Sequence, residues 1–339
     1  MSDPLIIAGA EVWDWTKLSS YIDCKLKGKL GFEDHLVPQE SSEALAFGIG
    51  MHRMAEVWTK ERMKGMLDQP ALELARGAFI VAWEGNLPAE RREKLEMEAN
   101  RRSVQNAIRL FEAYTRKFPL EMYDKVLALE TPFTLYLGTT PGGRSVCWSG
   151  ILDRAVRWQG GVYYVDLKTL SWAVDDRFFN GFRYSGQMIG YAWAGKEILG
   201  EDFAGIMVQG VEVKAAPKTS RGRGAEDMWG QDIIPIDRGH IEEWKRRVLW
   251  EVDQIHAHRE AGYYPPAMGH ACNVFGAGCQ FREWCWSPPE IRPAKAELLF
   301  KRRVWNPLDR EGTRDADRED TASDSVDGGI GRDRLEPGE

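Results

Sequence analysis

Val162-Tyr-Tyr-Val-Asp-Leu-Lys-Thr169 is the stretch on which the prediction of the fold depends, because its β-branched and aromatic residues are typical of a strand. Alternate side chains of a strand share a face, so Asp166 and Lys168 point the same way and Leu167 points into the opposite layer. An aspartate buried without a partner costs several kcal/mol. We therefore expect Lys168 and a metal ion to compensate the charge of Asp166.

A second acid, Asp153, ends the short motif Gly150-Ile-Leu-Asp153, and twelve residues separate it from Asp166. The region around both acids alternates β-rich runs with turn residues, over 126–137, 146–158 and 162–169. This pattern predicts three antiparallel strands in succession. The two acids therefore lie on neighbouring strands.

The rest of the chain is predicted to be mainly helical, with one further strand. Apolar periodicity predicts a helical N-terminal region over 11–118, including helices at 44–64 and 89–117, and further helices at 186–199 and 238–260. A strand is predicted at 205–213. Together these elements predict the α/β class, with a mixed central sheet flanked by helices. We expect one domain over 1–304, with a helical part at 11–118, an α/β core at 125–260 and a cysteine-rich segment at 263–290.

The formal charge of −7 is concentrated at the C-terminus, where residues 305–339 carry 11 acids and 5 arginines. This tail has few apolar residues, so we expect it to be disordered, and the preceding residues are nearly neutral. Basic residues are concentrated at 214–224 and 301–303. These clusters could bind phosphates, or they could be an ordinary solvated loop and helix end. No stretch has the roughly 20 apolar residues of a membrane span, and the N-terminus lacks a signal peptide pattern, so we expect a soluble cytoplasmic protein without a membrane partner.

Two further motifs lie in predicted helices. His52 follows Gly48 by four residues and could be a metal ligand, although a lone histidine is more often a core or surface residue. Gln187 and Tyr191 are spaced to share one helix face, which is also common in ordinary helices. Asp166 and Lys168 alone could likewise be a surface ion pair. The conjunction of the motifs carries the functional hypothesis.

In order, G-x-x-x-H, G-x-x-D, D-x-K and Q-x-x-x-Y are the motif series of the RecB-like PD-(D/E)XK nucleases, which this chain resembles over residues 20–290. The resemblance implies a restriction-endonuclease-like core and hydrolysis of DNA. It implies that Mg²⁺ or Mn²⁺ is held by His52, Asp153, Asp166 and the backbone carbonyl of Leu167. Hard cations favour such oxygen-rich sites. The remaining implied roles are activation of water by Lys168, positioning and backbone contact by Gln187 and Tyr191, and a supporting role for Glu130.

Four of the five cysteines fit a second resemblance. An odd number of cysteines in a protein expected to be cytosolic argues against a disulfide framework. The distant Cys24 and the trio Cys272, Cys279 and Cys285 resemble the layout of the iron-sulfur branch of these nucleases. That branch includes the nuclease of the AddAB helicase complex, exonuclease V-type enzymes and the CRISPR-associated exonuclease. The resemblance implies a structural [4Fe-4S] cluster that joins the two ends of the nuclease domain.

The spacing of the trio, C-x6-C-x5-C, departs from the more common C-x2-C-x5-C. Zn²⁺ is the competing cofactor, because His270 stands near, although zinc sites usually pair cysteines two to four residues apart. Cys147 is expected to be a small buried residue. Core packing is the expected role of most of the fourteen tryptophans, and Trp172 and Trp193 are the two to test first for stacking on unpaired bases.

These features predict a metal-dependent DNA exonuclease that acts on single strands or DNA ends. The alternative is a non-catalytic DNA-binding or assembly module that retains the nuclease fold. A third possibility is an enzyme that works only with a helicase, a recombinase or a spacer-integration protein, in repair, CRISPR adaptation or phage recombination. The sequence lacks G-x-x-x-x-G-K-[ST], so any motor would be another chain.

Overall fold

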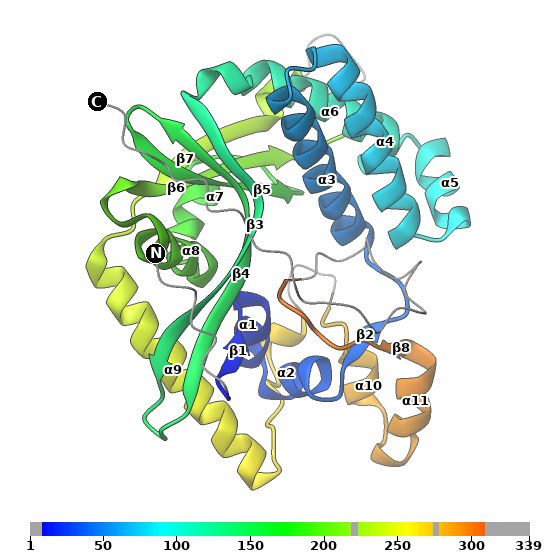
Figure 1. Ribbon diagram of the computed structural model, residues 1–339. Coiled ribbons are helices and arrows are strands. Elements are labelled where there is room, and N and C mark those ends of the chain that lie inside the picture. Colours follow the sequence, from blue (N-terminus) through cyan, green and yellow to red (C-terminus); the bar gives the residue numbers. More distant parts are fainter. Residues whose placement is uncertain (1–8, 218–222, 274–277, 309–339) are drawn as a thin grey trace, which may run out of the picture.

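The computed structural model of the chain describes residues 9–217, 223–273 and 278–308. Its centre is a six-stranded mixed sheet (Figure 1). The strands of this sheet are β1 (Glu11–Trp13), β3 (Lys125–Thr139), β4 (Ser145–Trp158), β5 (Gly161–Leu170), β6 (Phe203–Glu212) and β7 (Trp229–Ile234). The predicted α/β class with a mixed, helix-flanked sheet is confirmed.

The long strand β4 organises the sheet. Strand β3 pairs antiparallel with β4 along nearly its whole length, and β5 pairs antiparallel with the last part of β4. The short β1 pairs in parallel with Val146, Cys147 and Trp148 near the start of β4. Strand β6 continues the sheet in parallel beside β5, and β7 ends it in antiparallel orientation. The three predicted consecutive strands are therefore confirmed in order and direction.

Helices cover both faces of the sheet and enclose two separate apolar cores (Figure 1). One core packs α1, α7, α8 and α9 on the sheet, and includes Trp148, Trp193 and Trp244. The other packs α3, α4 and α6 on the opposite face, and includes Trp58 and Leu167. The bounds of the helices are α1 Trp15–Asp23, α2 Lys25–Phe32, α3 Glu43–Met63, α4 Asp68–Asn86, α5 Ala89–Met97, α6 Val104–Lys117, α7 Asp176–Phe182, α8 Gly186–Leu199, α9 Arg238–Ala261, α10 Arg282–Trp286 and α11 Arg292–Leu299. Short 3-10 turns lie at Leu120–Met122, Gly200–Asp202, Glu226–Met228, His270–Cys272 and Pro289–Ile291.

The prediction of one continuous helix over 89–117 is wrong in its middle. The segment divides into α5 and α6, and Ala99 between them has a left-handed φ of 46°. Ser103 starts α6 as its N-cap, because its side chain accepts the backbone N–H of Asn106 at 3.2 Å. Apolar periodicity continues across such a break, so it does not reveal the new cap.

Two segments from the N-terminal and C-terminal parts of the described chain, β2 (Leu36–Pro38) and β8 (Phe300–Arg302), lie side by side (Figure 1). Strand β2, which follows α2, pairs antiparallel with β8. Leu30 and Leu36 share a small apolar core there with Phe281 and Phe300. This second sheet brings the segment after Cys24 next to the cysteine-rich segment.

Several features escaped the sequence patterns. Strands β1, β2, β7 and β8 are short, and α7 has only seven residues, so none of them gives a clear period. Parts of the basic cluster 214–224 and of the cysteine-rich segment lie outside the described residues, as does nearly all of the acidic tail 305–339. Among the described residues, no helix is both long and apolar enough to cross a membrane.

Candidate active site

The two predicted acids meet where β4 and β5 separate. Backbone pairing of these strands ends at Arg154 and Val165. Immediately beyond this pair, Oδ2 of Asp153 accepts the backbone N–H of Leu167 at 3.1 Å. A side chain thus replaces the next backbone hydrogen bond of the ladder. The carboxylate of Asp153 is thereby fixed beside the residue that follows Asp166.

Asp166 is buried, with 4% of its surface exposed, and it pairs with Lys168. The Lys168 ammonium donates to Oδ1 at 3.0 Å and lies 2.8 Å from Oδ2, yet the buried Oδ2 accepts no hydrogen bond. Burial raises the pKa of Asp166. Attraction to Lys168 lowers it, but repulsion from Asp153 offsets part of that lowering, so the pKa stays above its usual value. Leu167 packs in the core on the opposite face, as the alternation of the strand predicts. The site therefore contains two interacting carboxylates and one ammonium.

A chain of hydrogen bonds orients the Lys168 side chain. Its ammonium donates to Oε1 of Gln187 at 3.1 Å, and Nε2 of Gln187 donates to the Tyr191 hydroxyl at 3.2 Å. The hydroxyl in turn donates to the backbone carbonyl of Ile151 at 3.1 Å. Gln187 and Tyr191 thus share one face of α8, as their spacing predicts. They join this helix to both of the strands that carry the acids.

His52 reaches the site from α3, on the opposite side of the sheet from α8. Its Nδ1 lies 3.2 Å from Oδ2 of Asp153. One turn earlier, Gly48 lies so close to β5 that a Cβ atom there would be 3.2 Å from Oγ1 of Thr169. The G-x-x-x-H spacing therefore has a physical reason: the glycine allows α3 to approach β5, and the histidine then reaches Asp153.

Glu130 lies on β3 next to the centre. The adjacent register pairs, Leu129 with Arg154 and Thr131 with Leu152, place Glu130 across from Asp153. Its φ of 46° lies in the left-handed region, which costs a non-glycine residue about 1–3 kcal/mol. Strained residues of this kind are concentrated at functional sites. The supporting role of Glu130 stays a prediction.

The sequence patterns missed Arg154, which lies beneath the site. It is 5% exposed, and its guanidinium donates to the hydroxyl of Tyr114 at 2.6 Å and to Oε1 of Gln209 at 3.0 Å. Burial lowers the pKa of Arg154, but Tyr114, Tyr123 and Asp153 raise it by more than burial lowers it. This buried cation therefore stays charged directly after Asp153. A single arginine in a strand gives no signal of burial, because most arginines are exposed.

The donor set at the centre fits a divalent cation by its chemistry. Two carboxylates repel each other across the gap, and Oδ2 of Asp166 is buried without a hydrogen bond. A cation would relieve both conditions, and carboxylate oxygens are the ligands that Mg²⁺ and Mn²⁺ prefer. Within residues 9–217, 223–273 and 278–308, no three His, Cys, Asp or Glu side chains are already arranged to hold a metal ion. Binding would therefore require His52, Asp153 and Asp166 to adjust.

The four candidate cysteines converge from the two ends of the chain. Sγ of Cys24 accepts the backbone N–H of Ala267 at 3.4 Å, and the N–H of Cys279 donates to the carbonyl of Cys272 at 2.9 Å. Burial, together with the charges of Cys279, Cys24 and Cys272, raises the pKa of Cys285 to about 11. Among the described residues, however, no three cysteines are arranged to hold a metal ion. Cys147 is fully buried in β4 beside β1, as expected.

The prediction that Trp193 stacks on bases is wrong. Its ring is 3% exposed, lies 5.9 Å from that of Trp244 and belongs to the core between α8 and α9. Its Nε1 donates to Oε1 of Glu197 at 3.1 Å. Trp172 is 52% exposed just after β5, so a role in base stacking remains a prediction.

This mixed sheet, with two acids and a lysine at the point where two of its strands separate, defines a nuclease of the restriction-endonuclease-like class. The family model of the PD-(D/E)XK nuclease superfamily matches residues 14–286. The chain belongs to this superfamily and is accordingly a nuclease.

Two further comparisons add little. One similar solved structure is described as a "Putative exonuclease" from Eubacterium rectale, with 14% sequence identity and a TM-score of 0.43. The alignment covers 79% of this chain and 90% of the other. A search of curated proteins gave no match.

Proposed function

We propose that this chain is a DNA nuclease that depends on Mg²⁺ or Mn²⁺ and degrades single strands or DNA ends. The observation that carries the proposal is the meeting of Asp153, Asp166 and Lys168, in which the two carboxylates repel each other and the ammonium lies 2.8 Å from the buried Oδ2 of Asp166. Phosphodiester hydrolysis requires groups that offset charge on the phosphate and its attacking water. A metal ion held by the two carboxylates, acting together with the neighbouring ammonium, would meet that requirement.

Asp153 and Asp166 would hold the cation, together with His52 and the carbonyl of Leu167. When bound, such an ion lowers the pKa of a coordinated water and neutralises charge on the phosphate. Asp153 is already fixed by the N–H of Leu167, and His52 is 3.2 Å from that carboxylate. Side chains held in this way lose little further freedom when a ligand binds.

Lys168 is the residue of the chain that acts on the water and the phosphate. Asp166 and Gln187 hold its ammonium from two sides, at 3.0 and 3.1 Å. In this position it orients the attacking water and offsets negative charge in the transition state. Gln187 and Tyr191 position Lys168 and provide polar groups for the DNA backbone.

The test is degradation of end-labelled single- and double-stranded DNA with Mg²⁺ or Mn²⁺, by the wild type, Asp166→Ala and Lys168→Ala. Removing an electrostatic group of this kind costs about 10²–10³-fold in rate. Calorimetry with Mn²⁺ separates the two roles, because Asp166→Ala loses the ion and Lys168→Ala retains it. Asp232→Ala removes an exposed acid on β7 and serves as the control. Full activity in either active-site variant would refute the assignment, and DNA binding by an inactive wild type would favour the non-catalytic module.

We also propose that Cys24, Cys272, Cys279 and Cys285 hold a structural [4Fe-4S] cluster, which would assign the chain to the iron-sulfur branch. The support is that Cys24 accepts the backbone N–H of Ala267, and that Cys279 and Cys285 pack in the same small apolar core as Leu26. The described cysteines are not yet arranged to hold a metal ion, so binding of a cluster would require them to move. Thiolates are the preferred ligands of such clusters. Zn²⁺ is the alternative, since it too accepts four thiolates.

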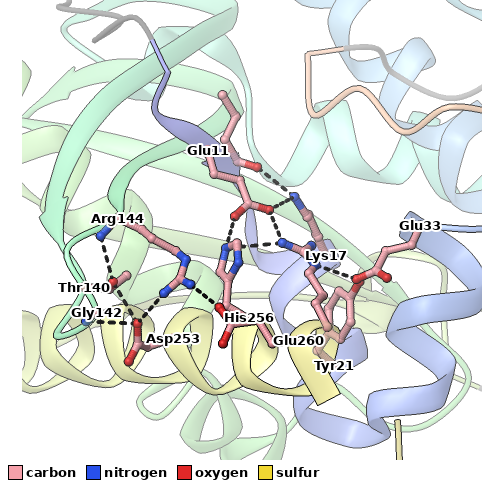
Figure 2. Close-up of polar contacts among 12 residues, drawn as sticks. Glu11, Lys17, Tyr21, Glu33, Thr140, Gly142, Arg144, Asp253, His256 and Glu260 are labelled. Carbon is pink, nitrogen blue, oxygen red and sulfur yellow. Dashed lines mark hydrogen bonds and ion pairs between the residues drawn. The ribbon is translucent and has the colours of Figure 1, made fainter. Parts of the chain in front are cut away.

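A polar network places the cysteine segments next to each other without any cofactor. The carboxylate of Glu33, which follows α2, accepts three hydrogen bonds: from Nε of Arg259 at 2.7 Å, from the hydroxyl of Tyr21 at 2.8 Å and from the hydroxyl of Tyr264 at 2.6 Å. Figure 2 shows Glu33 and Tyr21 in this network, together with Glu11 and His256. Tyr21 precedes Cys24 by three residues, and Tyr264 begins the C-terminal cysteine segment. The network thus joins the two segments that carry the ligands.

Anaerobic purification tests the cluster directly. We expect a brown protein with four irons per chain, about the stoichiometry of a [4Fe-4S] centre. Cys279→Ser is expected to lose the colour and the iron, whereas Cys147→Ala, which changes the buried cysteine of β4, keeps both. A colourless wild type that contains zinc would refute the iron-sulfur proposal and leave the nuclease proposal intact.

A further inference from the structure

A cavity of about 470 Å³ lies beside α8, outside the proposed catalytic centre. Its polar lining comes from three places: Arg183 and Tyr184 in the turn before α8, Lys196 in the last turn of α8, and Asp237 and His240 at the start of α9. Backbone and apolar side chains of β6 and β7 complete the wall. The cavity is therefore apolar at its base and mainly basic at its rim.

Neither of the two strong cations at this rim forms a short ion pair, although Lys196 is near enough to Asp237 for its charge to lower the pKa of that carboxyl. Arg183 and Lys196 are exposed, and neither side chain forms a hydrogen bond or an ion pair with another described residue. The nearby Asp237 caps α9, because its Oδ1 accepts the backbone N–H of His240 at 2.9 Å. Much of its negative charge is therefore directed at the helix end. The rim is thus suited to an anion.

Tyr184 adds a flat aromatic surface to the same rim. Its side chain is 85% exposed, although the backbone around it is well fixed. The N–H of Arg183 donates to the carbonyl of Asn180 at 3.3 Å, and the N–H of Ser185 donates to that of Phe182 at 3.1 Å. Ser185 also caps α8 through Met188. An exposed ring on a fixed turn can stack on a ligand with little loss of backbone entropy.

The cavity lies close to the proposed catalytic centre along the chain. Gln187, which holds Lys168 at 3.1 Å, follows Tyr184 by only three residues. Three residues span at most about 11 Å. The Cα atoms of Tyr184 and Gln187 therefore lie within about 11 Å of each other, while Lys196 lies near the other end of α8.

We propose that Arg183, Lys196 and Tyr184 bind a single-stranded segment of nucleic acid away from the bond that is cut. The two cations contact phosphates, and Tyr184 stacks on a base. The inference rests on the proposed nuclease function and adds a substrate-binding site to it. A single strand is the specified ligand because a base must be unpaired to stack on a side chain.

The experiment measures binding without catalysis. The full chain is titrated, in EDTA, into a fluorescent oligothymidylate of about 12 nucleotides, which spans roughly 40 Å when stacked, and anisotropy is followed at several salt concentrations. Each phosphate contact with a single strand contributes about 0.7 to the salt slope, so Arg183→Gln with Lys196→Gln should lower the slope by about 1.4. Tyr184→Ala should raise the Kd by roughly 5- to 150-fold, and Tyr184→Phe, which keeps the ring, should bind like the wild type.

Lys64→Gln and Arg246→Gln provide the matched controls, because these exposed cations are already paired with Glu61 and Glu243. Their salt slopes should equal that of the wild type. Three results would overturn the proposal: an unchanged slope in the Arg183 and Lys196 variant, equal affinity of Tyr184→Ala and the wild type, or equal losses for single-stranded and duplex DNA. Because no metal is present, these results are independent of whether the wild type cleaves DNA.

Discussion

Gly48→Ala tests whether the glycine of the G-x-x-x-H motif sets the position of His52. A Cβ atom at residue 48 would lie 3.2 Å from Oγ1 of Thr169, closer than the 3.4 Å at which ordinary contact begins. The two atoms must separate by at least 0.2 Å to reach ordinary contact, and because β-branched Thr169 has few alternative rotamers, we expect α3 to move away from β5. Asp153 belongs to β4 and does not follow this movement. The distance between His52 and Asp153, now 3.2 Å, should therefore change.

The expected magnitudes separate stability from catalysis. Alanine favours a helix interior by about 1 kcal/mol over glycine, while overpacking costs about 1–3 kcal/mol. The free energy of unfolding should thus change by no more than about 2 kcal/mol. A misplacement of about 1 Å can cost 10²-fold in rate, so a movement of roughly 0.2–0.5 Å should lower kcat/KM by about two- to tenfold.

The assay compares metal-dependent DNA cleavage with urea unfolding in a double-mutant cycle. Adding Thr169→Ala to Gly48→Ala removes Oγ1 and should restore most of the lost activity, whereas Thr169→Ser keeps an oxygen there and should not. Gly48→Ala with full activity would refute the reasoning. So would a loss of activity that Thr169→Ala fails to reverse, because the loss would then not come from this contact.

Three further predictions concern stability. Burial raises the pKa of Glu11, but Lys17 and Arg259 outweigh it and hold this pKa below 4.5. The stabilisation from Glu11 is thus present above about pH 4.5 and is lost as the pH falls through the lower folded-state pKa. The Tm difference between the wild type and Glu11→Gln should therefore shrink in acid, and a constant difference would contradict the prediction. Arg154→Met removes a long hydrogen bond to Thr59 and two short ones, to Tyr114 and Gln209, which are worth roughly 1.5–3 kcal/mol each, so the urea midpoint should fall with an unchanged m-value. Gly186→Ala would place a Cβ atom 2.0 Å from the ring of Trp15 and should cost at least about 1–3 kcal/mol, and wild-type stability in this variant would contradict the packing.

The core of the fold could be predicted because its elements are long and periodic. Helix α8 was predicted with its observed bounds, and β3 to β5 with bounds within a few residues. Strand alternation also predicted that Asp166 and Lys168 share a face while Leu167 packs behind them, as the structure shows. These features depend on local geometry alone.

The unpredicted features depend on contacts between distant residues. The burial of Arg154 comes from Tyr114 on α6 and Gln209 on β6, and neither is near it in sequence. The burial of Trp193 comes from the packing of α8 against α9, since its position after Tyr191 did not reveal which face it occupies. In both cases the local sequence pattern could not predict burial, because burial depends on neighbours that are distant in the sequence.

The gap between β4 and β5 explains how groups from both faces of the sheet can act on one substrate. A continuous sheet would separate α3 from α8, because each helix packs in a different apolar core. At the gap, Asp153 lies 3.2 Å from His52 of α3, while Lys168 donates to Gln187 of α8 at 3.1 Å. The candidate centre therefore requires both cores to be folded, and partial unfolding of either face would move one of these groups. Metal affinity should accordingly be lost together with tertiary structure, and metal binding by a state with only one intact core would contradict this dependence.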